Sequence, residues 1–366
     1  MTDAFQSAAG GKAAVVARGW VVRRSDNGTV SGSVESLAER GETDCSPADK
    51  PSSCPAEVCL AVEAAGFNYK DALACAGHPG VARRLPLVPG IDAAGVLRTA
   101  TADIPAGTPV VVTGNGLGET RPGGFATHLW ADASAVIKRP ASLSAEAAMA
   151  MGTAGLTAVL AVDRLAEVLH GPATGPSVED SGWLVTGASG GVGMLAVAAS
   201  ASAGHRVVAC TRKPAMAERL RALGAAAVIS PGDAVAAGTK PLASGRYHAV
   251  IDTVGGSLLA NLLRVVQPGG AVASIGNAGG NDLVTTVLPF ILRGVTLTGI
   301  DAAGLATNGD RRRLWPRLAG LWPLVRDHVP IQRMPLADVG EWARRMLAGQ
   351  TAGRGVVVPA LERPEE

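Results

Sequence analysis

The sequence predicts an α/β protein, in which a doubly wound parallel β-sheet is joined to a second domain that is rich in β-strands. Between residues 183 and 299, short apolar runs alternate with helical segments, which is typical of a parallel sheet covered by helices on both faces. A glycine-rich turn directly follows the first of these runs. Before residue 147, short β-like runs are instead separated by Gly and Pro, which indicates an all-β domain.

The glycine-rich turn lies between a predicted strand at residues 183–186 and a helix that ends at Gly204. It has the spacing Ala188-x-Gly190-x-x-Gly193, with alanine in the first place of a dinucleotide-binding motif. Gly190 has no side chain to hold a pyrophosphate away from the backbone, Gly193 lets the helix approach the strand, and the helix N-terminus attracts phosphate. The turn therefore predicts a Rossmann domain, with cofactor contacts from Ala188, Ser189, Gly190, Gly191, Val192 and Gly193.

The second strand of this unit, at residues 206–210, ends at Thr211, Arg212 and Lys213. An NAD-binding domain carries an acidic residue at this place for the ribose 2′-hydroxyl. A carboxylate would repel a 2′-phosphate, whereas a hydroxyl and two cations attract it, so we expect NADPH as the cofactor. The alternative is that Arg212 and Lys213 are only solvated charges at a strand end.

Further strands are expected at residues 227–229, 249–252, 271–275 and 295–299. A parallel sheet binds its ligand at the carboxyl ends of its strands. Two loops at such ends are expected to surround the nicotinamide, and their residues are Thr253, Val254, Gly276, Asn277 and Ala278. The strand at 295–299 is apolar and β-branched, which predicts a homodimer formed by pairing this edge with its copy.

The chain has 366 residues, of which 47% are hydrophobic and 17% are charged, enough for two domains with large cores. Its formal net charge of +2, without a basic patch that contains aromatic residues, argues against nucleic acid or a membrane as a partner. No N-terminal signal pattern is found, so we expect a cytoplasmic protein. The cysteines form no C-x-x-C pair, which argues against a disulfide framework or a structural zinc site; they are Cys45, Cys54, Cys59, Cys75 and Cys210.

The ends of the chain are expected to share one domain. Strands are predicted at residues 12–16, 58–63, 110–113, 126–129 and 135–138, and the polar residues 23–56 predict a mobile hairpin or insertion. Helices at 311–325 and around 339–347 precede a last strand at 355–358, which we expect to return to the N-terminal domain. Residues 1–146 with 307–366 are thus predicted to form the substrate domain, and residues 147–306 the NADPH-binding domain.

Several segments, taken in order, resemble one enzyme family. They are NYKDALACAG (68–77), LPLVPGIDAAG (85–95), MGTAGLTA (151–158), VTGASGGVG (185–193), IDTVGG (251–256) and TTVLPFILRGVTLTGID (285–301). With the domain order, they resemble the medium-chain dehydrogenase/reductase superfamily and, within it, the zinc-free acryloyl-CoA reductases and the similar quinone oxidoreductases. The resemblance includes GRGVVV at 353–358 and is weak over residues 20–56. It implies a GroES-like catalytic domain and cofactor contacts from Tyr69, Thr153, Ile300, Asp301 and Arg354.

The resemblance also bears on metal binding. Zinc enzymes of this superfamily carry Gly-His-Glu where this chain has Gly90-Ile91-Asp92, and isoleucine cannot bind a metal. His78 lies too early in the chain to replace that histidine. We therefore expect no metal. Without a Lewis acid, hydride addition to the conjugated C=C of an enoyl thioester or enone is more natural than alcohol oxidation.

By the same resemblance, the segment Asn68-Tyr69-Lys70-Asp71 faces the nicotinamide. Asn68 or Tyr69 could donate hydrogen bonds to a developing enolate oxygen, while Lys70 and Asp71 could order the site or relay a proton. Asp71 could equally cap the following helix, and Tyr69 could pack on the cofactor. His78, where the family usually has other residues, is a candidate acid or a solvated loop residue. Water is the remaining candidate for the proton donor.

Three functions of different class remain open at this point. The first is an NADPH-dependent reductase of an enoyl thioester or enone, and the second is an NADPH:quinone oxidoreductase whose pocket accepts flat rings. The third is a non-catalytic NADPH-binding protein. The presence of Asn68-Tyr69-Lys70-Asp71 beside an intact phosphate loop favours catalysis over the third. Arg83 and Arg84 could meet an anionic CoA or carrier-bound tail, or be surface charges.

Overall fold

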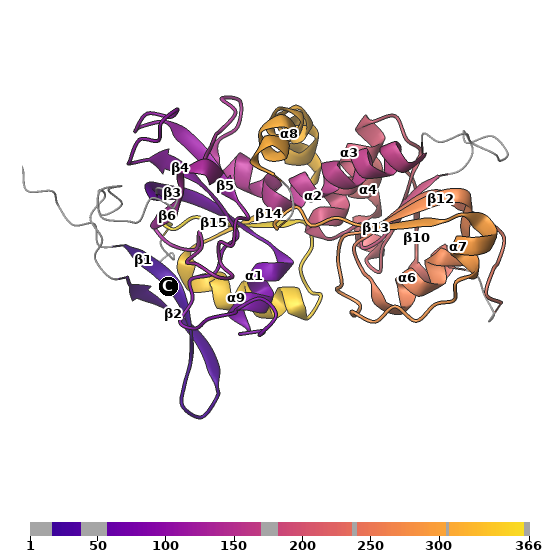
Figure 1. Cartoon of the computed structure of the whole chain (residues 1–366), viewed down its shortest axis with the longest axis horizontal. Coiled ribbons are helices and arrows are strands. Elements are labelled where there is room, and N and C mark those ends of the chain that lie inside the picture. Colours follow the sequence, from indigo (N-terminus) through magenta and orange to yellow (C-terminus); the bar gives the residue numbers. More distant parts are fainter. Residues whose placement is uncertain (1–16, 38–56, 170–181, 236–239, 305–306, 362–366) are drawn as a thin grey trace, which may run out of the picture.

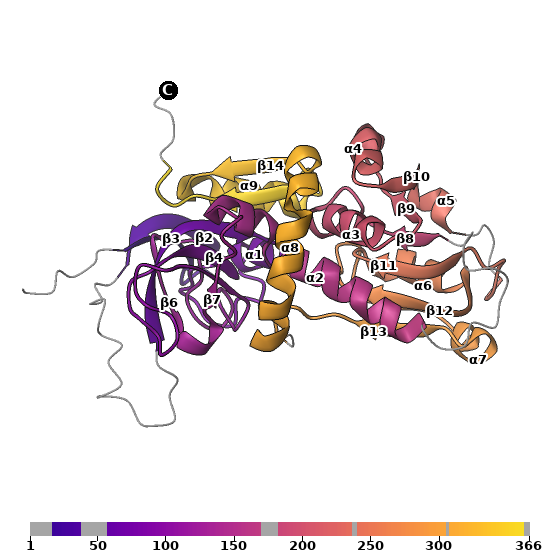
Figure 2. The ribbon, with the colours of Figure 1, turned by 90° about the horizontal axis from the view of Figure 1, so that it is seen from above.

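The computed structural model describes residues 17–37, 57–169, 182–235, 240–304 and 307–361. They form a β-rich lobe and an α/β lobe, with helix α8 (Asn308–His328) crossing one side of the molecule between them (Figure 1, Figure 2). Three sequence-based expectations lie outside the described residues, namely the strand at 12–16, the residues 38–56 of the hairpin or insertion, and Cys45 with Cys54.

The α/β lobe contains a parallel sheet whose six described strands have the order β10-β9-β8-β11-β12-β13. These strands are β8 (Trp183–Val185), β9 (Val207–Cys210), β10 (Ala225–Ile229), β11 (Tyr247–Asp252), β12 (Val266–Ser274) and β13 (Thr296–Gly299). The chain extends the sheet from β8 in one direction and then in the other, which is the doubly wound arrangement. The predicted fold class is therefore confirmed.

Helices cover both faces of this sheet, which is why its central strands consist of buried Val, Ala, Leu and Ile. The helices are α3 (Gly191–Ser202), α4 (Ala217–Ala222), α5 (Pro231–Ala234), α6 (Gly256–Leu263) and α7 (Leu288–Arg293). Figure 1 shows α3 and α4 on one side of the sheet and α6 on the other. Gly204 (φ 87°) and Gly224 (φ 103°) follow α3 and α4 in conformations that L side chains rarely adopt, so the chain can turn back into the next strand.

The β-rich lobe is built on a sheet in the order β14-β15-β3-β4-β5-β7, with β6 paired to β3. Its strands are β3 (Glu57–Phe67), β4 (Asp92–Leu97), β5 (Pro109–Thr113), β6 (His128–Asp132), β7 (Ile137–Lys138), β14 (Ile331–Met334) and β15 (Arg354–Val357). β15 pairs antiparallel with β3, through Gly355 and Phe67 among others. The last described strand thus returns to the N-terminal strands, as predicted.

A hairpin of β1 (Arg18–Arg24) and β2 (Val30–Ser36) joins this lobe, so the described part of the predicted hairpin is confirmed. It begins earlier than predicted, because Val21 and Val22 are buried and the backbone of this strand bonds to other loops. The N–H of Trp20 donates to the carbonyl of Phe125 at 2.9 Å, and that of Val22 donates to Leu87 at 2.8 Å.

Helix α2 (Ala145–Leu169) runs from the β-rich lobe into the α/β lobe (Figure 2). By length and composition alone, this helix could cross a membrane. However, 89% of its most apolar 18-residue stretch is buried inside the protein, so it is a core helix here. Its helical path breaks at Gly152, which has φ 44° and ψ −150°. The break divides α2 into a shorter half at the β-rich lobe and a longer half at the α/β lobe.

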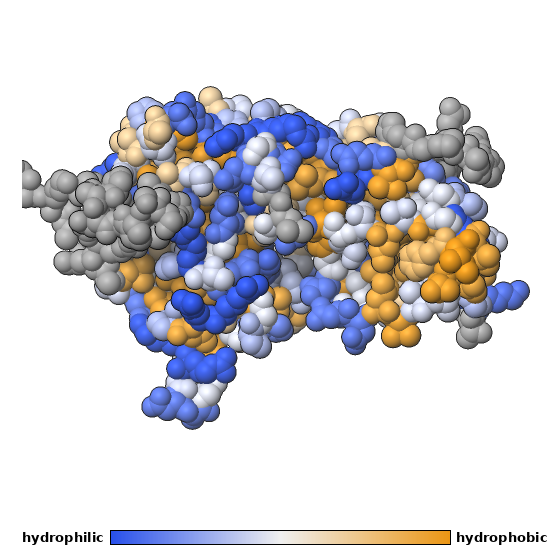
Figure 3. Space-filling model, in the orientation of Figure 1, coloured by the Kyte–Doolittle hydropathy of each residue, from blue (hydrophilic) through white to orange (hydrophobic). Residues whose placement is uncertain are grey.

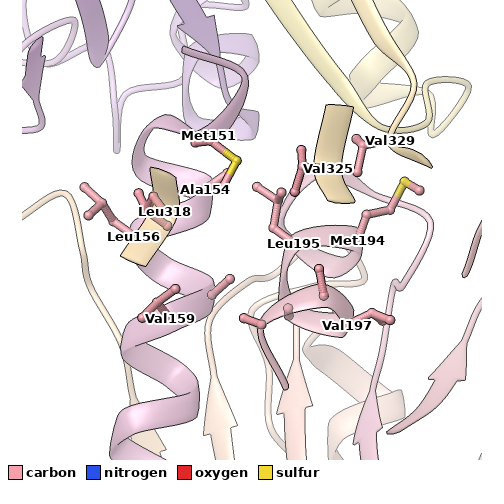
Figure 4. Close-up of a cluster of buried hydrophobic side chains, with 14 of the residues drawn as sticks. Met151, Ala154, Leu156, Val159, Met194, Leu195, Val197, Leu318, Val325 and Val329 are labelled. Carbon is pink, nitrogen blue, oxygen red and sulfur yellow. The ribbon is translucent and has the colours of Figure 1, made fainter. Parts of the chain in front are cut away.

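The main core lies where α2, α3 and α8 meet (Figure 4). Leu156 and Val159 of α2 and Leu195 of α3 belong to this cluster, as does Leu318 of α8. All four side chains are at most 1% exposed. Because α2 and α8 also reach the β-rich lobe, burial of this core fixes the two lobes against each other.

Candidate active site

A cavity of about 610 Å³ lies at the carboxyl ends of β8, β9, β11 and β12, facing the N-terminus of helix α1 (Tyr69–Cys75) from the other lobe. This is the edge at which a doubly wound sheet binds its ligand. The sequence-predicted residues that line it are Asn68, Tyr69, Lys70, Ser189, Gly190, Gly191, Val192, Gly193, Thr211, Arg212, Lys213, Thr253, Val254, Gly276, Asn277, Ala278 and Arg354. The fold therefore brings together residues that lie far apart in the sequence.

The glycine-rich turn passes directly into α3, and its backbone lies too close to its neighbours for larger residues. A Cβ atom at Gly193 would lie 2.2 Å from the carbonyl oxygen of Gly187, and one at Gly191 would lie 3.0 Å from Cδ of Arg354. Gly187 itself has φ 54°. The turn thus leaves the N-terminus of a helix of 12 residues open to the cavity, where its partial positive charge attracts phosphate. Ala188 is buried beneath the turn and does not line the cavity.

Two cations and two hydroxyls form the corner of the cavity at the end of β9. Thr211 Oγ1 donates to Ser189 Oγ at 2.8 Å, which joins this corner to the glycine-rich turn. Lys213 donates from Nζ to the carbonyl oxygen of Thr351, in the loop before β15. Burial and, second to it, the charge of Arg212 lower the pKa of Lys213. This corner suits a dianionic phosphate, which would offset the repulsion between the two cations.

The loop after β11 is ordered by a buried carboxylate. Asp252 Oδ1 accepts a hydrogen bond from Thr186 Oγ1 at 2.6 Å, and Oδ2 accepts one from the N–H of Gly255 at 2.7 Å. Burial raises the pKa of Asp252, whereas these hydrogen bonds lower it. Thr253 in turn donates from Oγ1 to the carbonyl of Thr186 at 2.9 Å. The wall formed by Thr253 and Val254 is therefore rigidly tied to β8.

The opposite wall is the segment Asn68-Tyr69-Lys70. Asn68 is 8% exposed, and its Nδ2 donates to Asp92 Oδ2 at 2.8 Å and to Asp71 Oδ2 at 3.3 Å. The Asn68 amide nitrogen is therefore engaged away from a substrate. Lys70 Nζ pairs with Glu119 Oε1 at 2.9 Å, while Tyr69 lies partly exposed on the wall.

Asp71 is fully buried and does not line the cavity. Its Oδ1 accepts from the N–H groups of Gly90 (3.1 Å) and Ile91 (2.9 Å), and its Oδ2 accepts from the N–H of Asn68 at 2.8 Å. Burial raises the pKa of Asp71 to about 7, and the charge of Asp92 adds to this, while the N–H donors oppose it. This geometry matches the capping and ordering role considered for Asp71, and a role as a proton relay stays a prediction.

Arg354 reaches from β15 to the glycine-rich turn, and it is 3% exposed. Its Nε donates to the carbonyl of Ala150 at 2.8 Å, and its terminal nitrogens donate to those of Phe67 (3.1 Å) and Met149 (3.4 Å). Burial lowers the pKa of Arg354, whereas the charges of Asp92 and Asp71 raise it. Arg354 is thus a buried cation that lines the cavity beside Gly191.

Four other predicted site residues lie outside the cavity lining, and their roles in the site stay predictions. His78 is exposed after the turn at Gly77 (φ 68°), and its Nδ1 accepts from the N–H of Gly80 at 3.1 Å. Asp301 is exposed and accepts from the N–H of Gly304 at 2.9 Å. The other two are Ile300 and Thr153, which bond to other parts of the protein. The N–H of Ile300 donates to the carbonyl of Ser274 beside the pairing of β12 and β13, and Thr153 donates both its N–H and its hydroxyl to Asp92.

Sequence reasoning missed Asp92 and Thr351. Asp92 appeared only as the residue after Ile91, and the sequence carries no sign that a kinked helix supplies its hydrogen-bond donors. Thr351 lies in an ordinary loop, and only the fold places it beside Lys213. Within the described ranges, no group of three or more His, Cys, Asp or Glu side chains is arranged to hold a metal. Ile91, at the place of the zinc-binding histidine, is 2% exposed.

Comparison with known proteins agrees with this architecture. The family described as "Alcohol dehydrogenase GroES-like domain" matches residues 54–141, and the family described as "Zinc-binding dehydrogenase" matches residues 191–319. The first match covers most of the N-terminal strands of the β-rich lobe, and the second covers the α/β lobe from the glycine-rich turn into α8. The two matches thus correspond to the two halves that enclose the cavity.

Relatives match across most of the chain. The acrylyl-CoA reductase AcuI of Ruegeria pomeroyi is 39% identical over 304 residues, 82% of this chain and 89% of that protein. The putative quinone oxidoreductase YhfP of Bacillus subtilis is 40% identical over 282 residues, 77% of this chain and 82% of that protein. The crystal structure of the yhdH oxidoreductase of Salmonella enterica in complex with NADP has a TM-score of 0.79 at 34% identity, covering 93% of this chain and 99% of that one. The chain therefore belongs to the medium-chain dehydrogenase/reductase superfamily, in the family that contains the acrylyl-CoA reductases and the YhfP-like quinone oxidoreductases.

Proposed function

We propose that this protein is an NADPH-dependent reductase of the conjugated C=C of an α,β-unsaturated thioester or carbonyl compound. The observation that carries the proposal is the cavity, which has a phosphate-binding turn with a cationic corner on one wall and the Asn68–Lys70 segment on the other. The 39% identity to an acrylyl-CoA reductase supports the substrate class. Residues 1–146 with 307–366 serve as the substrate domain, and residues 147–306 as the NADPH-binding domain.

The residues of the cavity fit NADPH. Gly187, Gly191 and Gly193 let the turn pack tightly, because a Cβ atom at each would meet neighbouring protein atoms, and the N-terminus of α3 faces the cavity. Arg212 and Lys213 would hold the 2′-phosphate, with Thr211 beside them. The loops at Thr253–Val254 and Gly276–Ala278 would enclose the nicotinamide. When bound, the cofactor supplies the hydride that adds to the β-carbon of the substrate.

This chain's own residues then stabilise charge and supply a proton. Negative charge develops on the carbonyl oxygen of the substrate as the hydride adds, and hydrogen-bond donors fixed beside that oxygen lower the barrier. Tyr69 and Lys70 line the cavity and are the candidate donors of the Asn68–Lys70 segment, because the Asn68 amide nitrogen is held by Asp92 and Asp71. The Lys70 ammonium has three N–H donors, so it can keep its ion pair with Glu119 and still donate to a substrate. Tyr69, or a water molecule beside it, then protonates the α-carbon.

A quinone reductase is the second candidate, and the 40% identity to the putative quinone oxidoreductase YhfP supports it. One assay separates the two: NADPH oxidation by the purified protein, followed with acryloyl thioester, crotonyl thioester and a benzoquinone. We expect the largest kcat/KM with a thioester. Preference for the benzoquinone would transfer the proposal to the second candidate. If the protein binds NADPH but oxidises it with none of these three compounds, a non-catalytic NADPH-binding protein would be favoured.

A homodimer and a cytoplasmic location complete the proposal. β13 is the last described strand at one edge of the parallel sheet, and apolar side chains stand exposed beside it. Val287, Ile291 and Leu292, at or next to α7, are 64%, 67% and 63% exposed, and Figure 3 shows the apolar surface at this end of the α/β lobe. Such a surface suits a second copy of the chain, paired through β13 across a two-fold axis. A cytoplasmic location suits a reductase supplied with NADPH.

A further inference from the structure

Asp92 is a buried carboxylate that the proposed reaction does not use directly. It lies at the start of β4, has no exposed surface, and does not line the cavity. Its Oδ2 accepts from the N–H of Thr153 at 2.8 Å and from Asn68 Nδ2 at 2.8 Å, and its Oδ1 accepts from the Thr153 hydroxyl. All three of these contacts are with the cavity wall or with α2, so Asp92 joins the two.

Burial raises the pKa of Asp92, and the break in α2 supplies hydrogen bonds that oppose this rise. A Cβ atom at Gly152 would lie 2.4 Å from Asp92 Oδ2, so only glycine allows the carboxylate to reach the first N–H of the second half of α2. The last carbonyls of the first half, at Met149 and Ala150, accept from Arg354 instead. A helix N-terminus attracts an anion and a C-terminus attracts a cation, so each half of α2 stabilises the buried charge at its end.

The Asp92 carboxyl group determines how Asn68 is oriented. Asp92 is the acceptor in each of these three hydrogen bonds, so it holds the Nδ2 end of the Asn68 amide toward itself. Asn68 is also the residue that caps α1, and the first two residues of α1 are Tyr69 and Lys70 on the cavity wall. The position of Asp92 is therefore transmitted to the groups that face the reactants.

We propose that Asp92 is a positioning residue of this active site: it holds Asn68, and with it the Tyr69–Lys70 wall, at a fixed distance from the second half of α2, with Arg354 as its counter-charge. The kinetic test of this inference rests on the proposed function. The binding test requires only that the protein binds NADPH.

The test is Asp92→Asn, because the new amide would direct a donor at Thr153 or Asn68 while keeping the volume of the side chain. We expect kcat with NADPH and acryloyl thioester to fall about 100-fold, as for a misplaced reacting group. The Kd for NADPH should change little, because the phosphate contacts lie on other residues. Asp163→Asn is the matched control: Asp163 lies on α2, the helix that Asp92 contacts, and pairs at the surface with Arg317, so the kcat of this variant should equal that of the unmodified protein.

A double variant and a milder variant complete the test. Asn68→Ala should add little to the loss of kcat in Asp92→Asn, since both act through one contact. Thr153→Val removes only the hydroxyl that donates to Asp92, and we expect kcat about fivefold lower in a protein that folds normally. A normal kcat in a folded Asp92→Asn variant overturns the proposal. If Asp92→Asn does not fold, a normal kcat in Thr153→Val overturns it instead. Additive losses in the double variant overturn it as well.

The binding readout separates this inference from the proposed function. NADPH fluorescence is measured on the unmodified protein, Asp92→Asn and Asp163→Asn without any substrate. An altered emission of bound NADPH in Asp92→Asn alone supports positioning, even if acryloyl thioester is not reduced. If bound NADPH has the same emission in all three proteins, and Asp92→Asn keeps a normal kcat on the acceptor that the protein reduces, then Asp92 is only a structural cap of α2.

Discussion

Lys213 donates a hydrogen bond from its ammonium to the backbone carbonyl of Thr351, although the two residues lie in different lobes. Lys213 follows β9 of the parallel sheet, and Thr351 lies between helix α9 (Val339–Leu347) and β15. The same loop donates the N–H of Gly353 to the carbonyl of Ser189 at 3.1 Å. An ammonium has three donors, so Lys213 can keep this bond and still bind a phosphate. The loop therefore holds one cation of the proposed 2′-phosphate site in place.

The first prediction follows from this corner. NADPH should be preferred over NADH by at least tenfold in kcat/KM, because a charge-assisted hydrogen bond contributes about 1.5 to 3 kcal/mol. Lys213→Met should lower kcat/KM with NADPH by about tenfold and leave the value with NADH nearly unchanged. Initial rates with both cofactors measure this. Lys138→Met, at an exposed lysine of β7, is the control and should change neither value. Equal use of both cofactors by the unmodified protein would contradict the assignment.

The second prediction is metal independence, based on Ile91 at the place of the zinc-binding histidine. Treatment with a chelator should leave NADPH oxidation unchanged, because no step of the proposed reaction needs a Lewis acid. Elemental analysis of the purified protein checks the same point. Stoichiometric zinc that is lost together with activity would show that another set of residues binds the metal.

The sequence predicted the parallel sheet and the glycine-rich turn, because each depends on local patterns that this fold keeps. It predicted the return of the last strand only as the simplest assembly of the chain ends, and the pairing of Gly355 with Phe67 agrees with it. It did not predict the role proposed for Asp92, since that role depends on the φ of Gly152 and on donors from Asn68 and Thr153, which lie 24 and 61 positions away in the chain. It left His78 open as a candidate acid or a solvated loop residue, and the turn at Gly77 and the hydrogen bond from Gly80 leave the imidazole exposed. Local spacing identifies segments that line a site, but it does not fix the direction of each side chain.

The third prediction concerns assembly. Light scattering at micromolar concentration should give twice the mass of one chain, because the apolar residues beside β13 lose water on pairing. Replacing Ile291 and Leu292 with Asp should shift the protein to monomers, since charges at these exposed positions oppose their burial. Leu347→Asp on α9, where the leucine is 36% exposed, is the control and should remain dimeric. A monomeric unmodified protein would refute the homodimer.

The fourth prediction is a pH dependence of stability from Asp71. Its pKa of about 7 in the folded protein exceeds the ordinary value of 3.8, so the folded state holds a proton that the unfolded chain has released between these values. The contribution of Asp71 to the free energy of unfolding therefore falls as pH rises through this window. Asp92 and Arg354 are the charged groups that act on Asp71 from neighbouring elements, and Asp92 adds to the rise in its pKa.

Asp71→Asn tests this pH dependence by denaturant unfolding at several pH values. The variant should be less stable than the unmodified protein, because its amide places a donor against the N–H groups that now bond to Asp71. The difference between the two should narrow as pH rises from about 4 to 7, since only the unmodified protein loses the contribution of Asp71. Asp163→Asn provides the control slope. A difference that is constant over this range would show that Asp71 does not titrate there.

The last prediction concerns the proton donor, and it compares two single substitutions. Tyr69 lies on the cavity wall, so Tyr69→Phe should lower kcat by about 100-fold if the hydroxyl protonates the substrate, which is the usual contribution of a general acid. His78 is exposed outside the lining, so His78→Phe should retain the kcat of the unmodified protein. Steady-state kinetics with NADPH and a saturating thioester measure both. Near-full kcat in both variants would make water the donor and leave Tyr69 the role of packing against the cofactor. A large loss in His78→Phe alone would mean that the 77–84 loop moves toward the cavity when substrate binds.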